Sequence, residues 1–192
     1  MQDLKIHSAE STAIMPCVNG RTTVMRNQHL HDVFIDGLKD IYDAETQLLK
    51  ALPQMEAAAT SSALKECFSN HLRETQQQVK RLELAFENID QPVESKTCAA
   101  MNSLMEEVQI ALQKKSALTR DAAIIAAAQK VEHYEIASYG TLKNWAQLMG
   151  HHTAANLLEQ NLQEEKMADR SLMQKARANS EPSTAAQASA DV

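Results

Sequence analysis

Apolar residues recur every three or four positions along four long stretches of the chain. This spacing is typical of amphipathic helices that bury one face. The long stretches cover residues 31–58, 61–88, 119–149 and 151–177, and a shorter amphipathic stretch covers residues 97–114. The pattern therefore predicts four long helices and one short helix.

The connections between these helices predict how they are arranged. Only a few residues join the first two long helices, with Ser61 or Ser62 as a candidate N-cap, and Gly150 ends the third just before the fourth. Each pair is therefore expected to form an antiparallel hairpin. About thirty residues separate the hairpins, which is long enough to cross from one end of a bundle to the other. The sequence thus predicts an all-α fold: a ferritin-like four-helix bundle with a long crossover containing an extra short helix.

The expected bundle occupies residues 28–177. Residues 1–27 show no helical period and contain Pro16 and Gly20, so we expect a flexible N-terminal extension. Residues 178–192 are biased toward Ala and Ser, so we expect a disordered C-terminal tail. The chain of 192 residues is long enough to bury the core of one domain.

The composition argues against two classes of partner. The formal net charge is −6 and Lys and Arg are not clustered, so we expect no nucleic-acid binding. The chain has no apolar run of about 18 residues, so we expect no membrane span. Cys17, Cys67 and Cys98 lie far apart, and the N-terminus lacks the parts of a signal peptide. These features favour a reducing cytoplasm.

Each long helix carries a carboxylate within its apolar stripe, near the middle of the helix. Because a helix turns by about 100° per residue, Glu45 shares a face with Ile41 and Leu38, and Glu135 shares a face with Val131. Such positions are costly for an acid unless something compensates its charge. The candidate metal ligands are Glu45, His71, Glu74, Glu132, Glu135, Glu165 and Asp169.

Buried carboxylates without a counter-charge repel one another and take up protons. Two bound metal ions would resolve this repulsion, and an oxygen-rich site with few imidazoles favours iron or manganese. Glu74 and Asp169, each taken alone, fit a solvated helix edge equally well. The alternative is a metal-free core, in which the acids are satisfied by hydrogen bonds from Tyr42, Tyr139, Gln78 and Asn161.

Four stretches resemble the YciE/YciF family of bacterial ferritin-like proteins: "DVFIDGLKDIYDAETQLLKALPQM", "HLRET", "AAIIAAAQKVEHYEIASYGTL" and "LLEQNLQEEKMAD". The resemblance covers roughly residues 28–177. It implies a rubrerythrin-like bundle in the bacterial cytoplasm, a homodimer, and an association with stress responses. It also implies a metal site made of Glu45, His71, Glu74, Glu132, Glu135 and Glu165.

The sequence departs from the Glu-x-x-His pattern of di-iron bundles at two places. His71 precedes Glu74, which reverses the order, and Ala168 stands where a second histidine would follow Glu165, with Asp169 as the nearest substitute. The leading hypothesis is a stress-associated protein whose two iron or manganese ions oxidise Fe(II) or react with peroxide or dioxygen. The alternatives are a non-catalytic scaffold or interaction protein with a vestigial site, and iron storage in a hollow cage.

Overall fold

The computed structural model describes the backbone of residues 19–180 and the side-chain environments of residues 29–178. Within this part of the chain every regular element is a helix. The helices are α1 (Asn19–Ala58), α2 (Ser62–Asn88), α3 (Ala99–Leu112), α4 (Ala117–Met149) and α5 (His152–Ser180). None of them has an apolar stretch that could cross a membrane.

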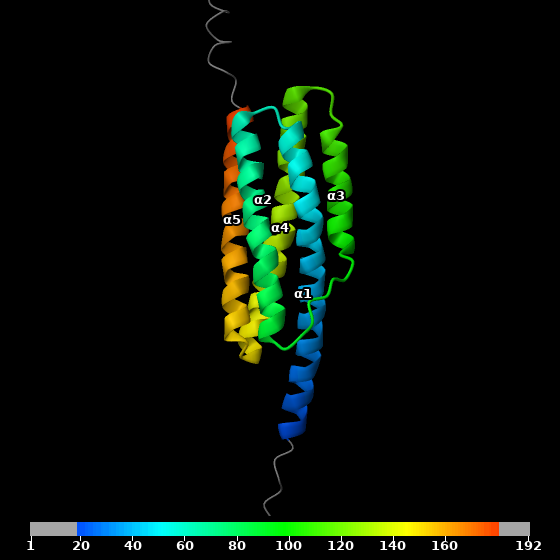
Figure 1. Ribbon diagram of the computed structural model, residues 1–192, viewed down its shortest axis with the longest axis vertical. Helices are drawn as coiled ribbons and strands as arrows, with labels where there is room; N and C mark the ends of the chain where they lie inside the picture. The colour runs from blue at the N-terminus through cyan, green and yellow to red at the C-terminus, as the bar shows by residue number, and fades with distance from the viewer. Residues whose placement is uncertain (1–18, 181–192) are drawn as a thin grey trace, which may run out of the picture.

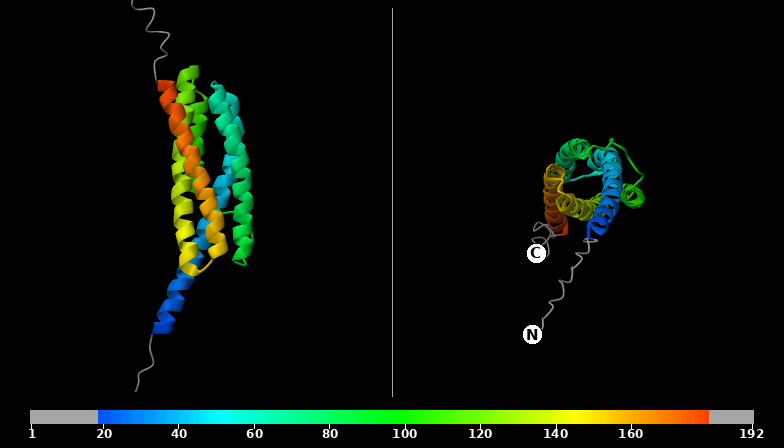
Figure 2. Two further views of the ribbon diagram at one scale, coloured as in Figure 1. Left: turned by 90° about the vertical axis from the view of Figure 1, so that its left-hand side faces the viewer. Right: turned by 90° about the horizontal axis from the view of Figure 1, so that it is seen from below.

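Four of the helices form the bundle, in the order α1, α2, α5, α4 around its axis (Figures 1 and 2). α3 lies outside this ring, where it packs against α1 and α4. The chain leaves α2 at one end of the bundle and enters α4 at the other, so α3 carries the crossover (Figure 1). The predicted all-α bundle, with a long crossover that contains an extra short helix, is confirmed.

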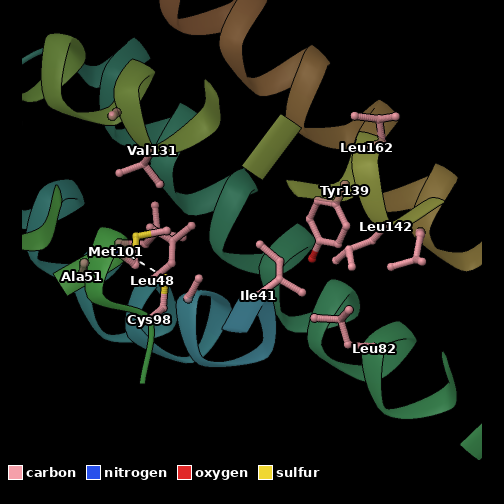
Figure 3. Packing of buried hydrophobic residues seen from close by; sticks show 14 of the residues in the cluster. Ile41, Leu48, Ala51, Leu82, Cys98, Met101, Val131, Tyr139, Leu142 and Leu162 are labelled. Carbon is pink, nitrogen blue, oxygen red and sulfur yellow. Dashed lines mark hydrogen bonds between the residues drawn. The ribbon is translucent and has the colours of Figure 1, made fainter. Parts of the chain in front are cut away.

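The core lies between the four bundle helices. Ile41, Leu82, Tyr139 and Leu162 come one each from α1, α2, α4 and α5, and each is exposed by 4% or less (Figure 3). Burying one apolar side chain of this size contributes about 1.5–3 kcal/mol to folding. The apolar stripes of the sequence therefore face one another as their period predicts.

The turn between α1 and α2 is held by α4. Ser61 is the N-cap residue of α2, but its side chain makes no capping hydrogen bond. Instead, the Asp121 carboxylate accepts from the Thr60 amide (2.8 Å), the Thr60 hydroxyl (2.6 Å) and the Ser61 amide (2.9 Å). Nε of Arg120 donates to the carbonyl of Ala58 (2.9 Å). Side chains of α4, which belongs to the second hairpin, therefore hold the turn of the first hairpin in place.

The turn between α4 and α5 depends on a glycine. Gly150 caps the C-terminus of α4 with φ +82°, in the left-handed region where side chains are strained. The predicted end of this helix is confirmed. In the first part of the crossover, between α2 and α3, Asp43 of α1 accepts hydrogen bonds from the Ser95 hydroxyl and the Cys98 amide, both at 2.9 Å. These contacts hold the irregular segment before α3 against α1.

The prediction that the first helix starts at residue 31 is wrong, because α1 begins at Asn19. Figures 1 and 2 show its N-terminal end projecting beyond the other helices, and the sequence there has no apolar period that marks the start of a helix. α3 is shorter than the predicted 97–114. Residues 19–27 of the predicted extension and 178–180 of the predicted tail are helical instead. Residues 1–18 and 181–192 lie outside the described residues, so for them the extension and tail stay predictions.

Candidate metal centre

Four candidate ligands from three helices converge within the bundle. His71 lies on α2, Glu132 and Glu135 on α4, and Glu165 on α5. One ligand atom from each of them lies within 4.8 Å of all the others. Their residues are exposed by 3% or less. This cluster of one imidazole and three carboxylates could hold a metal ion.

The helical period explains why the cluster forms. Glu132 and Glu135 are three residues apart, so both project from one side of α4. Val131 and Tyr139 lie on the same buried side of α4, and Leu162 precedes Glu165 on the buried side of α5. Packing these apolar neighbours against the other helices forces the acids into the interior. The burial of the acids is thus a direct result of the apolar stripes around them.

His71 has a different acid at each of its ring nitrogens. Nε2 lies 3.4 Å from Oε1 of Glu132 and 3.7 Å from Oε2 of Glu165. Nδ1 lies 3.4 Å from Oε2 of Glu74. Burial lowers the pKa of His71, but the charge of Glu165 and the hydrogen bond and charge of Glu74 outweigh it, so the pKa is raised. His71 therefore connects the buried cluster with Glu74.

Two of the acids each receive one buried hydrogen bond. The Tyr139 hydroxyl donates to Oε1 of Glu45, and Nε2 of Gln78 donates to Oε1 of Glu165. Burial and then the charges of Glu45 and Glu135 raise the pKa of Tyr139, so its hydroxyl keeps the proton that it donates. These bonds fix one oxygen of each carboxylate and leave the other oxygen without a partner.

Buried polar atoms without hydrogen-bond partners are concentrated at this place. Among the described residues the unpaired side-chain atoms are Oε2 of Glu45, Nε2 of His71, Oγ1 of Thr75, Oε1 of Gln78, Oε2 of Glu132, both oxygens of Glu135, Oε2 of Glu165 and Oδ1 of Asp169. An unpaired buried polar atom costs about 1–3 kcal/mol. Native proteins have few of them. A concentration of this kind fits a site whose ligand completes it.

Three buried acids at this place, Glu45, Glu132 and Glu135, have raised pKa values. Burial raises the pKa of Glu45, Glu132 and Glu135 well above the usual range. The charge of Glu165 raises the pKa of all three further. A cation placed among these groups would reverse this effect, because it favours the ionised form.

Not all predicted ligands join the cluster. The side chain of Glu74 is 39% exposed and approaches the cluster through His71. Asp169 is 21% exposed, and its Oδ1 lies 3.5 Å from Nδ1 of His133. The side chain of His133 is 66% exposed, so it points away from the core as expected. Glu45 is fully buried and acts on Glu132 and Glu135 through its charge.

Thr75 belongs to the site and was not predicted from the sequence. It is fully buried, and its hydroxyl has no hydrogen-bond partner among the described residues. It lies four residues after His71 and three before Gln78, on the same stripe of α2. This spacing is the feature of the sequence from which Thr75 could have been predicted. Threonine is common on buried helix faces, so its type alone did not single it out.

A polar cavity of about 190 Å³ adjoins the cluster between α2 and α5. His71 and Glu74 contribute to its wall from α2, and Ser171 contributes from α5. The fully buried acids are not part of this wall, so His71 separates them from the cavity.

Residues 29–185 match a protein family described as a domain of unknown function, DUF892. The chain belongs to this family. Protein YciF of Escherichia coli (strain K12) is 44% identical over 154 residues, which covers 76% of this chain and 89% of that relative. The resemblance to the YciF family that the sequence stretches indicate is confirmed.

Solved structures that are similar to this chain have the same fold. The crystal structure of the E. coli stress protein YciF superimposes with a TM-score of 0.76 at 43% identity, covering 78% of this chain and 96% of that one. YcfI of Rhodopseudomonas palustris, described as a candidate structural protein, superimposes with a TM-score of 0.72 at 43% identity. The match covers 74% of this chain and 92% of that one. A protein from Xanthomonas campestris pv. campestris superimposes with a TM-score of 0.60 and covers 78% of this chain and 92% of its own. Because it is only 21% identical, it shows the fold alone.

Proposed function

We propose that this chain is a cytoplasmic, stress-associated ferritin-like protein that holds two iron or manganese ions in the buried cluster. The observation that carries the proposal is the convergence of His71, Glu132, Glu135 and Glu165 within 4.8 Å. Each of these side chains has at least one buried atom that no other described residue satisfies. Metal ions would supply the missing partners.

The charge of the site supports two ions rather than one. Glu45, Glu132, Glu135 and Glu165 are buried acids that act on one another electrostatically. Two divalent cations carry the four positive charges that would balance four carboxylates. The charge of Arg81 favours ionised Glu45 only as the last of several contributions, and both Nη atoms of Arg81 pair with Glu164 at 2.6 and 2.7 Å.

The donor set favours iron or manganese. Carboxylate oxygens outnumber the single imidazole nitrogen of His71. Oxygen-rich donors of this kind suit iron and manganese, whereas structural zinc sites use several Cys and His ligands. When bound, such ions could promote the oxidation of Fe(II) by dioxygen or peroxide.

The protein's own side chains orient the ligands. With Nδ1 of His71 donating to Glu74, the lone pair of Nε2 faces Glu132 and Glu165. Tyr139 holds one oxygen of Glu45, and Gln78 holds one oxygen of Glu165. The apolar core around them limits access of bulk water, which strengthens every charge interaction within the site.

A non-catalytic structural role is the alternative proposal. The observation in its favour is Ala168, which lies where a second histidine would follow Glu165. YcfI, a relative of 43% identity, is also described as a candidate structural protein. A homodimer remains our proposal for the assembly, and it rests on the family resemblance alone.

The test is elemental analysis of protein purified from cells supplied with iron and manganese. We expect about two ions per chain in the wild type, as in other di-metal carboxylate bundles, and loss of metal in Glu135→Gln. Glu159→Gln on α5 is the matched control, because its carboxylate pairs with Lys143 outside the cluster. This control should keep the full metal content.

A second measurement separates binding from co-purification. Adding Mn(II) to metal-free wild type should raise the melting temperature, because an ion that binds only the folded state at 100 times its Kd adds about 2.7 kcal/mol. It should also release protons, since the raised pKa values leave protons on the acids. A wild type that contains no metal and is not stabilised by Mn(II) or Fe(II) would rule out the proposal and favour the structural role.

A further inference from the structure

The buried cluster needs a route by which an ion could reach it. Glu135 and Glu165 are fully buried, and Glu132 is 2% exposed. An ion moving between water and these acids must therefore pass another part of the protein. The cavity between α2 and α5 lies on the solvent side of His71, which is itself only 3% exposed.

The wall of this cavity is rich in groups that can bind a cation. Cys67, Asn70, His71 and Glu74 contribute from α2, and Met167 and Ser171 from α5. The carboxylate of Glu74 and the hydroxyl of Ser171 are oxygen donors of the kind that replace water around a divalent cation. The amide oxygen of Asn70 accepts from the Arg73 guanidinium instead. The cavity of about 190 Å³ has room for several water molecules beside such an ion.

Glu74 and His71 connect the cavity with the cluster. The Glu74 side chain is 39% exposed and contacts Nδ1 of His71 at 3.4 Å. On the other side of the same ring, Nε2 lies 3.4 Å from Glu132 and 3.7 Å from Glu165. A continuous series of potential ligands thus leads from solvent to the buried acids.

Two other surface cavities do not offer this connection. A larger one, about 350 Å³, lies between α1 and α4, with Tyr134 and Trp145 in its largely apolar wall. Another, about 210 Å³, lies between α3 and α4, with Lys130 in its wall. Neither wall contains a member of the metal cluster.

We propose that the α2–α5 cavity is the port through which hydrated divalent cations enter and leave the cluster, and that Glu74 is their first protein ligand. This inference rests on the proposed metal-binding function. In this role Glu74 binds the ion in transit and is not a permanent member of the site. Its negative charge at the mouth attracts cations and raises the rate of association.

Cys67 provides a way to block the port. Its thiol is half-buried in the cavity wall, 3.5 Å from the hydroxyl of Ser171, whereas Cys98 is fully buried. Alkylation with iodoacetamide would place an amide group inside the cavity. Cys67→Ser treated with the same reagent is the matched control, because any other cysteine that reacts is modified in both proteins.

The readout is the rate at which Mn(II) enters metal-free protein and leaves loaded protein. Samples are quenched with excess chelator at set times, desalted and analysed for bound manganese. Alkylated wild type should take up and release Mn(II) at least about tenfold more slowly. Because a port changes only the path, both rates should fall by the same factor, with the final stoichiometry and Kd unchanged. Alkylated Cys67→Ser should behave like the untreated protein.

Glu74→Gln tests the first ligand separately. The amide oxygen of glutamine can still accept from Nδ1 of His71, so the imidazole keeps its orientation while the charge is lost. We expect uptake of Mn(II) to slow by about tenfold, in the range of electrostatic steering, with unchanged stoichiometry. Glu66→Gln is the control, since Glu66 is an exposed acid of α2 outside the cavity wall.

The outcomes distinguish the port from the site. Unchanged uptake and release after alkylation, in protein that binds Mn(II) at equilibrium, would overturn the port and leave the proposed function intact. Faster release and a higher Kd in Glu74→Gln would instead make Glu74 a resident ligand, and would also overturn its role here. If Mn(II) does not bind at equilibrium, the proposed function itself fails.

Discussion

Helix α4 contains two acids that are almost equally buried, Asp121 at 3% exposure and Glu135 at 0%. They differ in how many hydrogen bonds they accept. Asp121 accepts three hydrogen bonds from the turn between α1 and α2, from Thr60 and Ser61. Neither oxygen of Glu135 accepts a hydrogen bond from the described residues. Burial alone therefore does not mark a ligand site, since one of these acids is fully satisfied by the protein and the other is not.

The pKa values of the two acids follow this difference. Burial raises the pKa of Asp121, but the hydrogen bonds from Thr60 and Ser61 outweigh it, so the pKa is lowered. Burial and the charges of Glu45 and Glu165 raise the pKa of Glu135 well above its usual range. Asp121 thus stabilises the fold as an anion, whereas ionised Glu135 requires a cation.

The largest expected effect comes from removing the satisfied acid. Asp121→Ala leaves the amides of Thr60 and Ser61 without partners at the start of α2. We expect the free energy of unfolding to fall by about 3 kcal/mol, because these hydrogen bonds involve a charged acceptor and are lost together. Urea denaturation of metal-free protein measures this. The bound-metal stoichiometry should stay that of wild type, and a loss below about 1 kcal/mol would contradict a structural role for Asp121.

The next effect is a pH dependence of opposite sign at the two acids. In metal-free protein the raised pKa of Glu135 contributes stability that is complete below the ordinary value of 4.5 and is lost as pH rises through the folded-state pKa. The lowered pKa of Asp121 contributes stability that is present above 3.8 and is lost as pH falls through the folded-state pKa. Metal-free protein should therefore be most stable under mildly acidic conditions.

Glu135→Met isolates this contribution, because methionine fills a similar volume without a charge. We expect wild type to lose about 1–2 kcal/mol of stability between about pH 5 and pH 8, and the variant to lose less. Near pH 8 the metal-free variant should equal or exceed the wild type in free energy of unfolding. Chemical denaturation over a pH series with chelator present gives the slopes. If the free energy of unfolding depended on pH with the same slope in both proteins, Glu135 would not be the source of this pH dependence.

The smallest expected effect concerns the single donor to Glu45. Tyr139→Phe removes the hydroxyl that donates to Oε1 of this buried acid. We expect a loss of about 1 kcal/mol in metal-free protein, the usual contribution of one hydrogen bond. Mn(II) affinity should also fall by about tenfold, because Tyr139 orients Glu45, one of the four carboxylates that we propose to balance the charge of the ions. Tyr42→Phe is the control, since its hydroxyl bonds half-buried Glu83 at 3.2 Å. Equal Mn(II) affinities in the two variants would contradict an orienting role.

The sequence was sufficient to predict the bundle, because each apolar stripe needs a partner and the connection lengths allow few arrangements. It was insufficient to predict the start of α1 at Asn19. The N-terminal end of α1 projects beyond the other helices (Figure 1), and its sequence has no apolar period that marks the start of the helix.

Prediction of the site was limited in a different way. The helical period placed Glu45, Glu135 and Glu165 on the buried face, and the structure agrees. The helical period does not show whether a side chain at the edge of the buried face reaches the centre of the bundle. For this reason the prediction grouped Glu74 and Asp169 with the buried acids. The period also gave no indication of Asp121, whose partners lie about sixty residues earlier in the chain.

The division of the site between the two hairpins has a kinetic consequence. The first hairpin contributes His71 to the cluster, and the second contributes Glu132, Glu135 and Glu165. Neither hairpin alone can assemble the cluster, so ions bound there would cross-link two halves of the chain that meet only when the bundle closes. Such a cross-link slows unfolding and leaves the folding rate nearly unchanged, since it stabilises only what forms after the transition state. The lifetime of the folded chain against proteolysis would then follow the supply of metal.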